Sequence, residues 1–192
     1  MASGWAFRKL KNKLMKTLLY FFLLLGASTF AQQKYLTKTG QISFEASVPS
    51  FEEVAAKNNS VTAILNTENG EFAALVLVKA FRFKNALMEE HFNENYAESH
   101  LYPKATFKGK IKDFDFKQLK DTYKISGELT FHGVAKPINN VTIKLKNTDG
   151  NITLSSSFKL LPSDYNIKIP SIVKSKISDE VVTTIELLLV KQ

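Results

Sequence analysis

After Gln32 the sequence alternates between apolar and polar side chains with a period of two, and this pattern limits the fold more than any other feature. Residues 104–112 show it clearly, because Ala105, Phe107 and Ile111 alternate with four lysines and a threonine. Such alternation is typical of antiparallel strands that bury one face and expose the other to water. The sequence therefore predicts an all-β domain.

Turn residues divide the alternating sequence into about eight strands. They are expected over residues 35–46, 60–65, 71–83, 104–112, 123–134, 140–146, 151–161 and 180–191. In the first strand, alternation assigns Leu36, Ile42, Phe44 and Ala46 to one face and Tyr35 to the other.

The expected strand 71–83 is apolar on both faces, so both of its faces need cover from other parts of the chain. One helix is predicted directly after it. Asn85 fits the N-cap, Glu89 and Glu90 suit the first turns, and apolar residues recur at helical spacing as far as Tyr96. We expect this helix to supply the cover.

Eight antiparallel strands avoid exposed edges most simply by closing into a barrel. An eight-stranded antiparallel barrel with one short helix is therefore the expected fold. Its interior is either filled by side chains or wide enough for one small ligand. A flattened sandwich with a dry core has the same alternation, and the periodicity does not choose between the two.

The first 31 residues differ from the rest of the chain. They hold five Lys/Arg and no Asp/Glu, and an apolar run over 18–25 is followed by the small residues Thr29 and Ala31. This order is typical of a secretory signal peptide, here cleaved before Gln32. A membrane anchor is the alternative, but the run is short against the roughly 20 residues that span a bilayer. We expect residues 1–31 to be a signal peptide and 32–192 to form one periplasmic domain, with Met15 as an alternative start and 1–14 as an upstream extension.

Residues 32–192 carry 21 basic and 18 acidic side chains, so the net charge of +8 for the whole chain falls to +3. A domain this close to neutral is a poor match for nucleic acid. The chain has no Cys, which excludes thiol catalysis, disulfides and thiolate metal sites. A row of lysines at 104, 108, 110 and 112 would suit a phosphate or an anionic membrane. We favour the interpretation that these lysines form the solvent-exposed face of a strand, where they prevent edge pairing.

The usual motifs of catalysis and cofactor binding do not occur. Ser171 and Lys174 have the Ser-x-x-Lys spacing of penicillin-recognising enzymes, but the companion elements are reversed or missing. His91, Glu94 and His100 would offer ligands for a divalent metal, although His91 and Glu94 fit the border and the solvated side of the predicted helix equally well. We expect no enzyme activity, no cofactor and no metal.

Local strings between residues 87 and 137 are more specific. LMEEHF begins at Leu87, YPKATFKG follows from Tyr102, and GELTFHGV begins at Gly127 with Lys136 and Pro137 behind it. Together they resemble the YceI-like family, and the resemblance spans most of residues 35–190. It implies a lipocalin-like barrel of a secreted bacterial protein, with a hollow lumen that holds a polyisoprenoid or another long-chain amphiphile.

Two segments depart from the family pattern. Residues 161–167 lack the Arg that members typically carry beside an Asp-Phe-Gly-like segment, and residues 47–51 replace an early segment with His and Gly-Arg-Phe. Head-group contacts near these places are therefore not carried over from the resemblance.

Because the resemblance implies a hollow barrel, alternation predicts which side chains line it. Eleven Phe and five Tyr lie within residues 32–192. The expected lining is Phe44, Phe72, Phe107, Ile111, Leu129, Phe131, Ile143, Phe158, Ile185 and Leu187, with Leu87 and Phe92 closing one end. His132 is either a buried structural residue or a polar contact at the ligand entrance.

These observations favour a periplasmic carrier that sequesters a polyisoprenoid, a fatty acid or a fatty amide, with transient membrane contact and no contact with nucleic acid. One alternative is a dry barrel that serves as an adaptor or stress-response protein beside a membrane cytochrome. The other is an enzyme acting on a lipid, with His132 as its proton-transfer group. A filled interior would support the adaptor.

Overall fold

The computed structural model describes Met15, residues 33–49 and residues 51–192. The predicted signal peptide and its cleavage point lie outside the described residues, Met15 excepted. In chain order the elements are β1 (Lys34–Ser47), β2 (Ala55–Asn66), β3 (Glu71–Leu77), η1 (Val78–Ala80), β4 (Arg82–Phe83), α2 (Ala86–His91), η2 (Phe92–Tyr96), β5 (Lys104–Ile111), β6 (Thr122–Phe131), β7 (Val134–Thr148), β8 (Asn151–Leu160), η3 (Pro162–Tyr165) and β9 (Ile177–Lys191). Within this described part, no helix has the length and apolar content needed to cross a bilayer.

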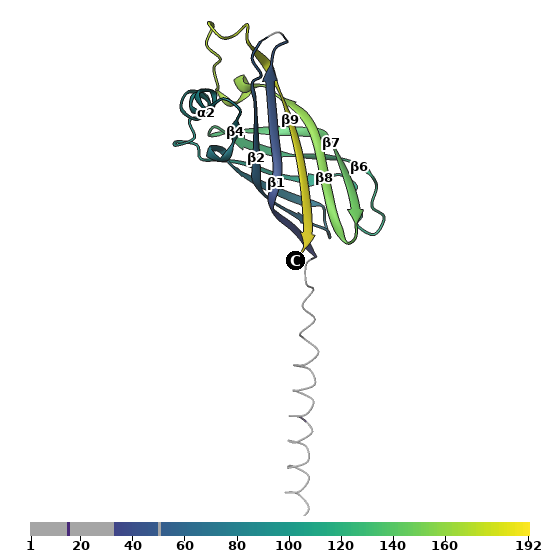
Figure 1. Cartoon of the computed structure of the whole chain (residues 1–192). Helices are drawn as coiled ribbons and strands as arrows, with labels where there is room; N and C mark the ends of the chain where they lie inside the picture. The colour runs from purple at the N-terminus through teal and green to yellow at the C-terminus, as the bar shows by residue number, and fades with distance from the viewer. Residues whose placement is uncertain (1–14, 16–32, 50) are drawn as a thin grey trace, which may run out of the picture. The chain divides into compact units, whose positions relative to one another are not determined.

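The strands form one antiparallel sheet that closes on itself (Figure 1). Its order is β1-β9-β8-β7-β6-β5-β3-β2-β4, and β1 pairs with β2 as well as with β9. Because the two-residue β4 pairs with β2, the closed ring consists of the eight longer strands. Where the start of β1 lies beside the end of β9, the Gln192 amide donates to the Lys34 carbonyl at 2.9 Å. The predicted eight-stranded barrel is confirmed, and the flattened sandwich is not observed.

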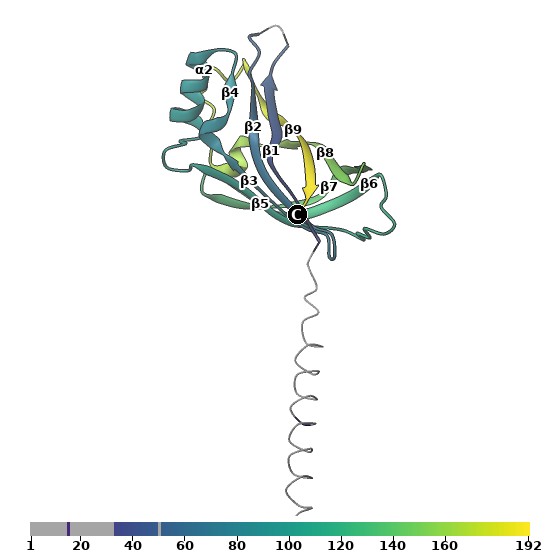
Figure 2. The ribbon, with the colours of Figure 1, turned by 60° about the horizontal axis from the view of Figure 1, so that its bottom comes forward.

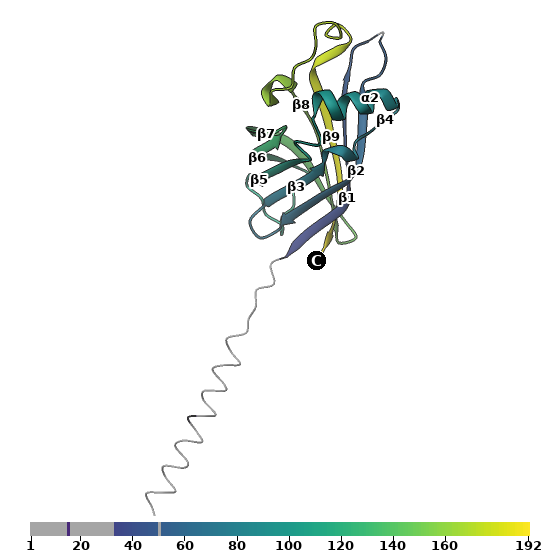
Figure 3. The same cartoon turned by 90° about the vertical axis from the view of Figure 1, so that its left-hand side faces the viewer.

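The predicted helix over residues 85–96 consists of α2 and the wider turn η2. Both lie beside β4 at the end of the barrel opposite the C-terminus, as Figures 2 and 3 show. One end of the barrel therefore carries helical cover.

A β-bulge in β1 changes which side chains point inward. The register against β2 shifts between Thr37 and Gly40, and one extra residue in a strand reverses the alternation beyond it. Tyr35 is consequently buried in the core, where the regular alternation predicted Leu36. Ile42 keeps its predicted inward direction.

The strand predicted over residues 71–83 is shorter. It ends at Leu77 and is followed by η1 at Val78–Ala80. The Val78 amide donates to the Pro103 carbonyl, one residue beyond the Leu77–Lys104 pair of β3 and β5. The Val78 side chain is fully buried. This turn directs Phe81 into the core, where it is 6% exposed.

Two strands, β7 and β2, begin at least five residues earlier than predicted. His132 and Gly133 both have positive φ, at 49° and 72°, which is the conformation of a two-residue type I′ hairpin. β6 therefore ends at Phe131, and β7 begins at Val134 instead of residue 140. β2 begins at Ala55 instead of residue 60, since its first residues pair with the end of β1 and with β4.

Side chains fill the end of the barrel that holds the start of β1 and the end of β9. The residues packed there are Tyr35, Ala63, Leu65, Ile111, Tyr123, Leu145, Ile152 and Leu189. The loop between β5 and β6 adds two further rings, with Phe116 5.5 Å from Tyr35 and Phe114 5.7 Å from Tyr123 between centroids. We call this part the filled end.

Candidate ligand-binding cavity

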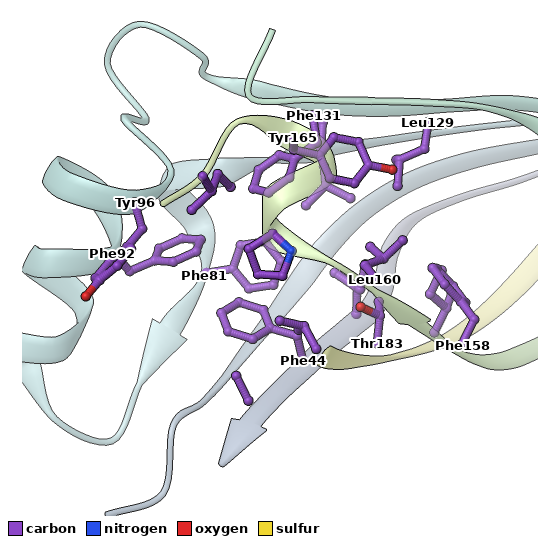
Figure 4. A pocket seen from close by; sticks show the side chains of 18 of the residues that line it. Phe44, Phe81, Phe92, Tyr96, Leu129, Phe131, Phe158, Leu160, Tyr165 and Thr183 are labelled. Carbon is purple, nitrogen blue, oxygen red and sulfur yellow. The ribbon is translucent and has the colours of Figure 1, made fainter. Parts of the chain in front are cut away.

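The other half of the barrel is hollow. It contains a cavity of about 470 Å³, within the size range of small-molecule sites. All eight longer strands contribute to its wall, part of which is shown in Figure 4. The larger apolar side chains that the strands contribute to the wall include Ile42, Phe44, Phe72, Phe107, Ile125, Leu129, Phe131, Ile138, Ile143, Leu154, Phe158, Leu160, Ile185 and Leu187.

Three segments surround the opening of this cavity, and we call them the mouth: residues 51–54, 85–96 and 167–177. Among the described residues, the acidic, basic and histidine side chains that line the cavity close to its opening are Glu52, Lys176 and His91, all of them in the mouth and all exposed. The cavity therefore has an apolar interior and a polar rim at one end only.

Four phenylalanines form an aromatic cluster inside the mouth. The Phe44 ring lies 5.2 Å from Phe81 and 5.4 Å from Phe92, and Phe83 lies 5.2 Å from Phe92. Such separations suit tilted and edge-to-face ring contacts. Phe92 lies at one side of the mouth, and Leu87 lines the rim, where it is 58% exposed.

Asn85 fixes the start of α2, as its N-cap pattern predicts, and also joins the helix to the β1–β2 loop. Its Oδ1 accepts from the Leu87 amide at 2.9 Å, and its Nδ2 donates to Glu52 Oε1 at 2.9 Å. The neighbouring Lys84 pairs with Glu53. These exposed contacts connect two sides of the mouth, and each stabilises little in water.

Two glycines make room for the Phe107 ring at the wall. Gly109 of β5 and Gly127 of β6 are opposite each other. A Cβ at Gly109 would lie 2.6 Å from Phe107 Cζ, and one at Gly127 would lie 2.8 Å from it. Backbone atoms lie closer still, with the Ser126 carbonyl oxygen 2.5 Å from the first Cβ and the Lys108 carbonyl oxygen 2.3 Å from the second, so a larger residue at either position would displace the sheet as well as the ring.

Two hydroxyl-bearing side chains lie deep in the wall. Tyr165 is 2% exposed and Thr183 is 5% exposed. Thr183 is flanked on neighbouring strands by Phe44 and Phe158 (Figure 4). Burial, with a smaller contribution from the Asp164 charge, raises the pKa of Tyr165 to about 12. The phenol therefore keeps its proton at neutral pH.

Comparison with known families now identifies the barrel. The model of the YceI-like domain matches residues 34–189, a range that holds every strand except the last two residues of β9. The chain belongs to the YceI-like family. No curated protein matches the sequence.

Solved structures share this YceI-like fold at low sequence identity. A polyisoprenoid binding domain from Saccharophagus degradans, implicated in plant cell wall breakdown, has a TM-score of 0.70 at 16% identity, covering 83% of this chain and 98% of that one. BcnA of Burkholderia cenocepacia has a TM-score of 0.65 at 16% sequence identity, covering 78% of this chain and 95% of that one. A Campylobacter jejuni YCEI protein has a TM-score of 0.61 at 18% sequence identity, covering 76% of this chain and 88% of that one.

The YceI-like barrel brings together most of the predicted lumen residues. Those in the cavity wall are Phe44, Phe72, Phe107, Leu129, Phe131, Ile143, Phe158, Ile185 and Leu187, with Leu87 and Phe92 in the mouth. Ile111 is not in the wall: it is 1% exposed at the filled end, because β5 continues beyond the hollow half. Ligand contact at the lining residues stays a prediction.

His132 does not line the cavity either. Its Nδ1 donates to the Tyr165 carbonyl at 2.9 Å, its Nε2 lies 2.8 Å from Glu98 Oε2, and its ring packs 4.5 Å from that of Tyr102. His132 therefore joins the β6–β7 turn to η3 and to the segment after η2. This geometry supports the structural interpretation of His132 over the ligand-entrance interpretation.

We expect His132→Asn to lower the free energy of unfolding by about 1–3 kcal/mol, because the shorter side chain leaves the Tyr165 carbonyl without its buried donor and also loses the contact with the partly exposed Glu98 carboxylate. Asn tolerates the positive φ at this position, so the turn itself is kept. Urea denaturation measures the loss, and affinity for an added apolar chain should stay unchanged. Equal stability of the two proteins would contradict this role.

The structure adds no support to a metal site formed by His91, Glu94 and His100. Within residues 33–49 and 51–192, no three His, Asp or Glu side chains gather closely enough to hold a metal ion. His91 lies exposed in the mouth, and Glu94 and His100 are exposed as well.

Among the cavity residues outside the predicted lining are Phe81, Tyr165 and Thr183. Phe81 and Tyr165 belong to turns, where alternation does not predict side-chain direction. Thr183 had a usable signal, since it takes an inward position among the alternating apolar residues of β9. A polar residue in an inward row is the pattern to look for.

Proposed function

We propose that this YceI-like protein binds one long apolar chain in its barrel and carries or sequesters it. The observation that supports this most directly is the apolar cavity of about 470 Å³ with charged groups only at its mouth. A chain that enters the cavity leaves water along most of its length, and the polar rim allows one end to stay solvated.

The expected affinity follows from the burial of methylene groups. Each contributes about 0.8 kcal/mol when it leaves water. Ten of them contribute roughly 8 kcal/mol before entropic losses, which corresponds to about micromolar affinity. Because one methylene changes the affinity only a few-fold, chain length would be discriminated weakly.

A polyisoprenoid is the ligand class we favour, and a fatty acid or fatty amide is the alternative. Support comes from the Saccharophagus degradans domain, which is described as polyisoprenoid binding and shares the fold. We further propose that the protein acts in the periplasm, on the basis of the signal-peptide pattern in residues 1–31.

The hollow interior favours a carrier over a dry adaptor beside a membrane cytochrome. A role as an enzyme is less well supported. Its candidate proton-transfer group, His132, lies outside the cavity wall and is engaged by Tyr165 and Glu98. We therefore propose a binding function without catalysis.

Native mass spectrometry tests the proposal. The protein, purified from a bacterial periplasm, is expected to carry a single adduct with the mass of a lipid, and this adduct should be released on denaturation. Protein that shows no adduct and also fails to bind added long-chain lipids would contradict the proposed function.

We also propose that the mouth contacts a membrane transiently to exchange its ligand. Ile172 lies in the mouth and is 84% exposed. The surrounding residues 166–178 contain Lys168, Lys174 and Lys176 and no acidic residue. An exposed apolar side chain among basic ones suits an anionic bilayer surface.

Ile172→Asp is expected to slow ligand transfer from vesicles that contain phosphatidylglycerol by about tenfold, since it replaces the inserting side chain with a repelled charge. The equilibrium affinity should not change. Leu188→Asp is the matched control, because Leu188 is 56% exposed on β9, outside the mouth. Equal slowing in both variants would argue against a membrane-facing mouth.

A further inference from the structure

Two hydroxyl groups in the cavity lack a protein partner. Within the described residues, neither the Tyr165 phenol nor the Thr183 hydroxyl has a protein hydrogen-bond partner, and both residues line the cavity with most of the side chain buried. Neither oxygen is a fully buried unpaired atom, since Asn93 Oδ1 alone has that status among the described side chains, so both hydroxyls are accessible from the cavity. Ser156 offers a contrast in the same wall, because its hydroxyl donates to the Thr142 carbonyl at 2.8 Å. Water can pair these hydroxyls in the empty cavity, but a bound apolar chain displaces that water, so the two hydroxyls would stay paired only if the ligand itself carries a hydrogen-bonding group.

Both hydroxyls are fixed in place by their surroundings. Thr183 belongs to β9 and pairs in register with Phe44 of β1 and Phe158 of β8, so it interrupts an inward row of aromatic rings. Tyr165 ends η3, its carbonyl accepts from His132, and its ring packs 5.8 Å from Phe131. In Figure 4 the Tyr165 oxygen points away from the mouth toward Leu129.

From this geometry we propose that the lumen recognises a neutral hydrogen-bond acceptor within its apolar ligand, through the hydroxyls of Tyr165 and Thr183. This inference rests on the proposed binding of an apolar chain. It adds that the chain carries a carbonyl or similar uncharged oxygen, positioned inside the barrel instead of at the mouth.

The charge distribution limits the acceptor to an uncharged group. Among the described lining residues, the charged side chains are Glu52 and Lys176, and both are exposed in the mouth. A carboxylate or phosphate drawn into the lumen would lose its water without gaining a basic partner. Tyr165, whose pKa is raised by burial, remains a donor at physiological pH and suits an oxygen acceptor.

Two probes of matched chain length separate the hydroxyl contacts from chain burial: heptadecan-9-one, whose carbonyl lies in mid-chain, and heptadecane. Their affinities are measured by displacement of a fluorescent fatty probe from wild type, Tyr165→Phe, Thr183→Val and the double variant. Each substitution removes one hydroxyl and keeps the side-chain shape. The Tyr165 carbonyl that binds His132 is also kept.

We expect each single substitution to weaken ketone binding by about tenfold, the effect of one lost buried hydrogen bond. Heptadecane binding should be unchanged or tighter, and it serves as the folding control. A ketone-to-alkane affinity ratio that is the same in all four proteins would overturn the inference and leave the proposed function intact. If wild type binds neither probe, the proposed function fails and the inference fails with it.

Discussion

Ile185→Asp is expected to weaken binding of a long apolar chain by more than about 100-fold, or about 2.8 kcal/mol. Ile185 lies on β9 in the hollow half and faces the cavity. A bound chain would strip water from the new carboxylate, and an unpaired charge in an apolar site costs several kcal/mol. Without ligand, water in the cavity solvates the Asp side chain, so the variant should remain folded.

Val182→Asp is the matched control for this experiment. Val182 is on the same strand and has a β-branched aliphatic side chain, but it is 40% exposed on the outer face of the barrel. The affinity of the Val182→Asp protein for a fluorescent fatty probe should equal that of wild type. If Ile185→Asp binds the probe as well as Val182→Asp does, the ligand does not occupy this cavity.

Leu65→Ala is expected to lower the free energy of unfolding by about 2–5 kcal/mol, the usual cost of truncating a fully packed leucine. Leu65 is 0% exposed at the filled end, where neighbouring side chains surround it on all sides. Urea denaturation measures the loss. Since this end is remote from the mouth, protein that remains folded should bind its ligand with unchanged affinity.

Ile185→Ala provides the comparison from the hollow half. Ile185 is only half-buried and already faces a cavity, so truncation removes fewer packing contacts. The expected loss is less than about half of that at Leu65, because the cost rises with the packing that is lost. Equal losses at the two positions would mean that the lumen is as tightly packed as the filled end.

Regular alternation was enough to predict the barrel strands and most of the cavity wall. Phe107, Leu129 and Phe158 face the cavity as a period of two requires, and Asn85 begins the helix as its side chain indicates. The predictions were wrong where the backbone departs from regular geometry. The bulge in β1 exchanges the roles of Tyr35 and Leu36.

Other features depend on where an element lies along the barrel axis, which the sequence pattern does not encode. Ile111 and Phe107 share one face of β5, yet Ile111 is packed at the filled end and Phe107 lines the cavity. That the barrel is hollow at all was implied by the family resemblance, because alternation fits a filled barrel equally well. Tyr165 enters the wall through η3, beyond the reach of any strand pattern.

The hydrogen bond between the Gln192 amide and the Lys34 carbonyl places the C-terminus at the pole of the barrel opposite the mouth. An affinity tag or dye attached after Gln192 would point away from the ligand entrance. Protein captured on a sensor chip by such a tag would present its opening to the solution, so lipid uptake and release can be followed on immobilised molecules without obstruction by the tether.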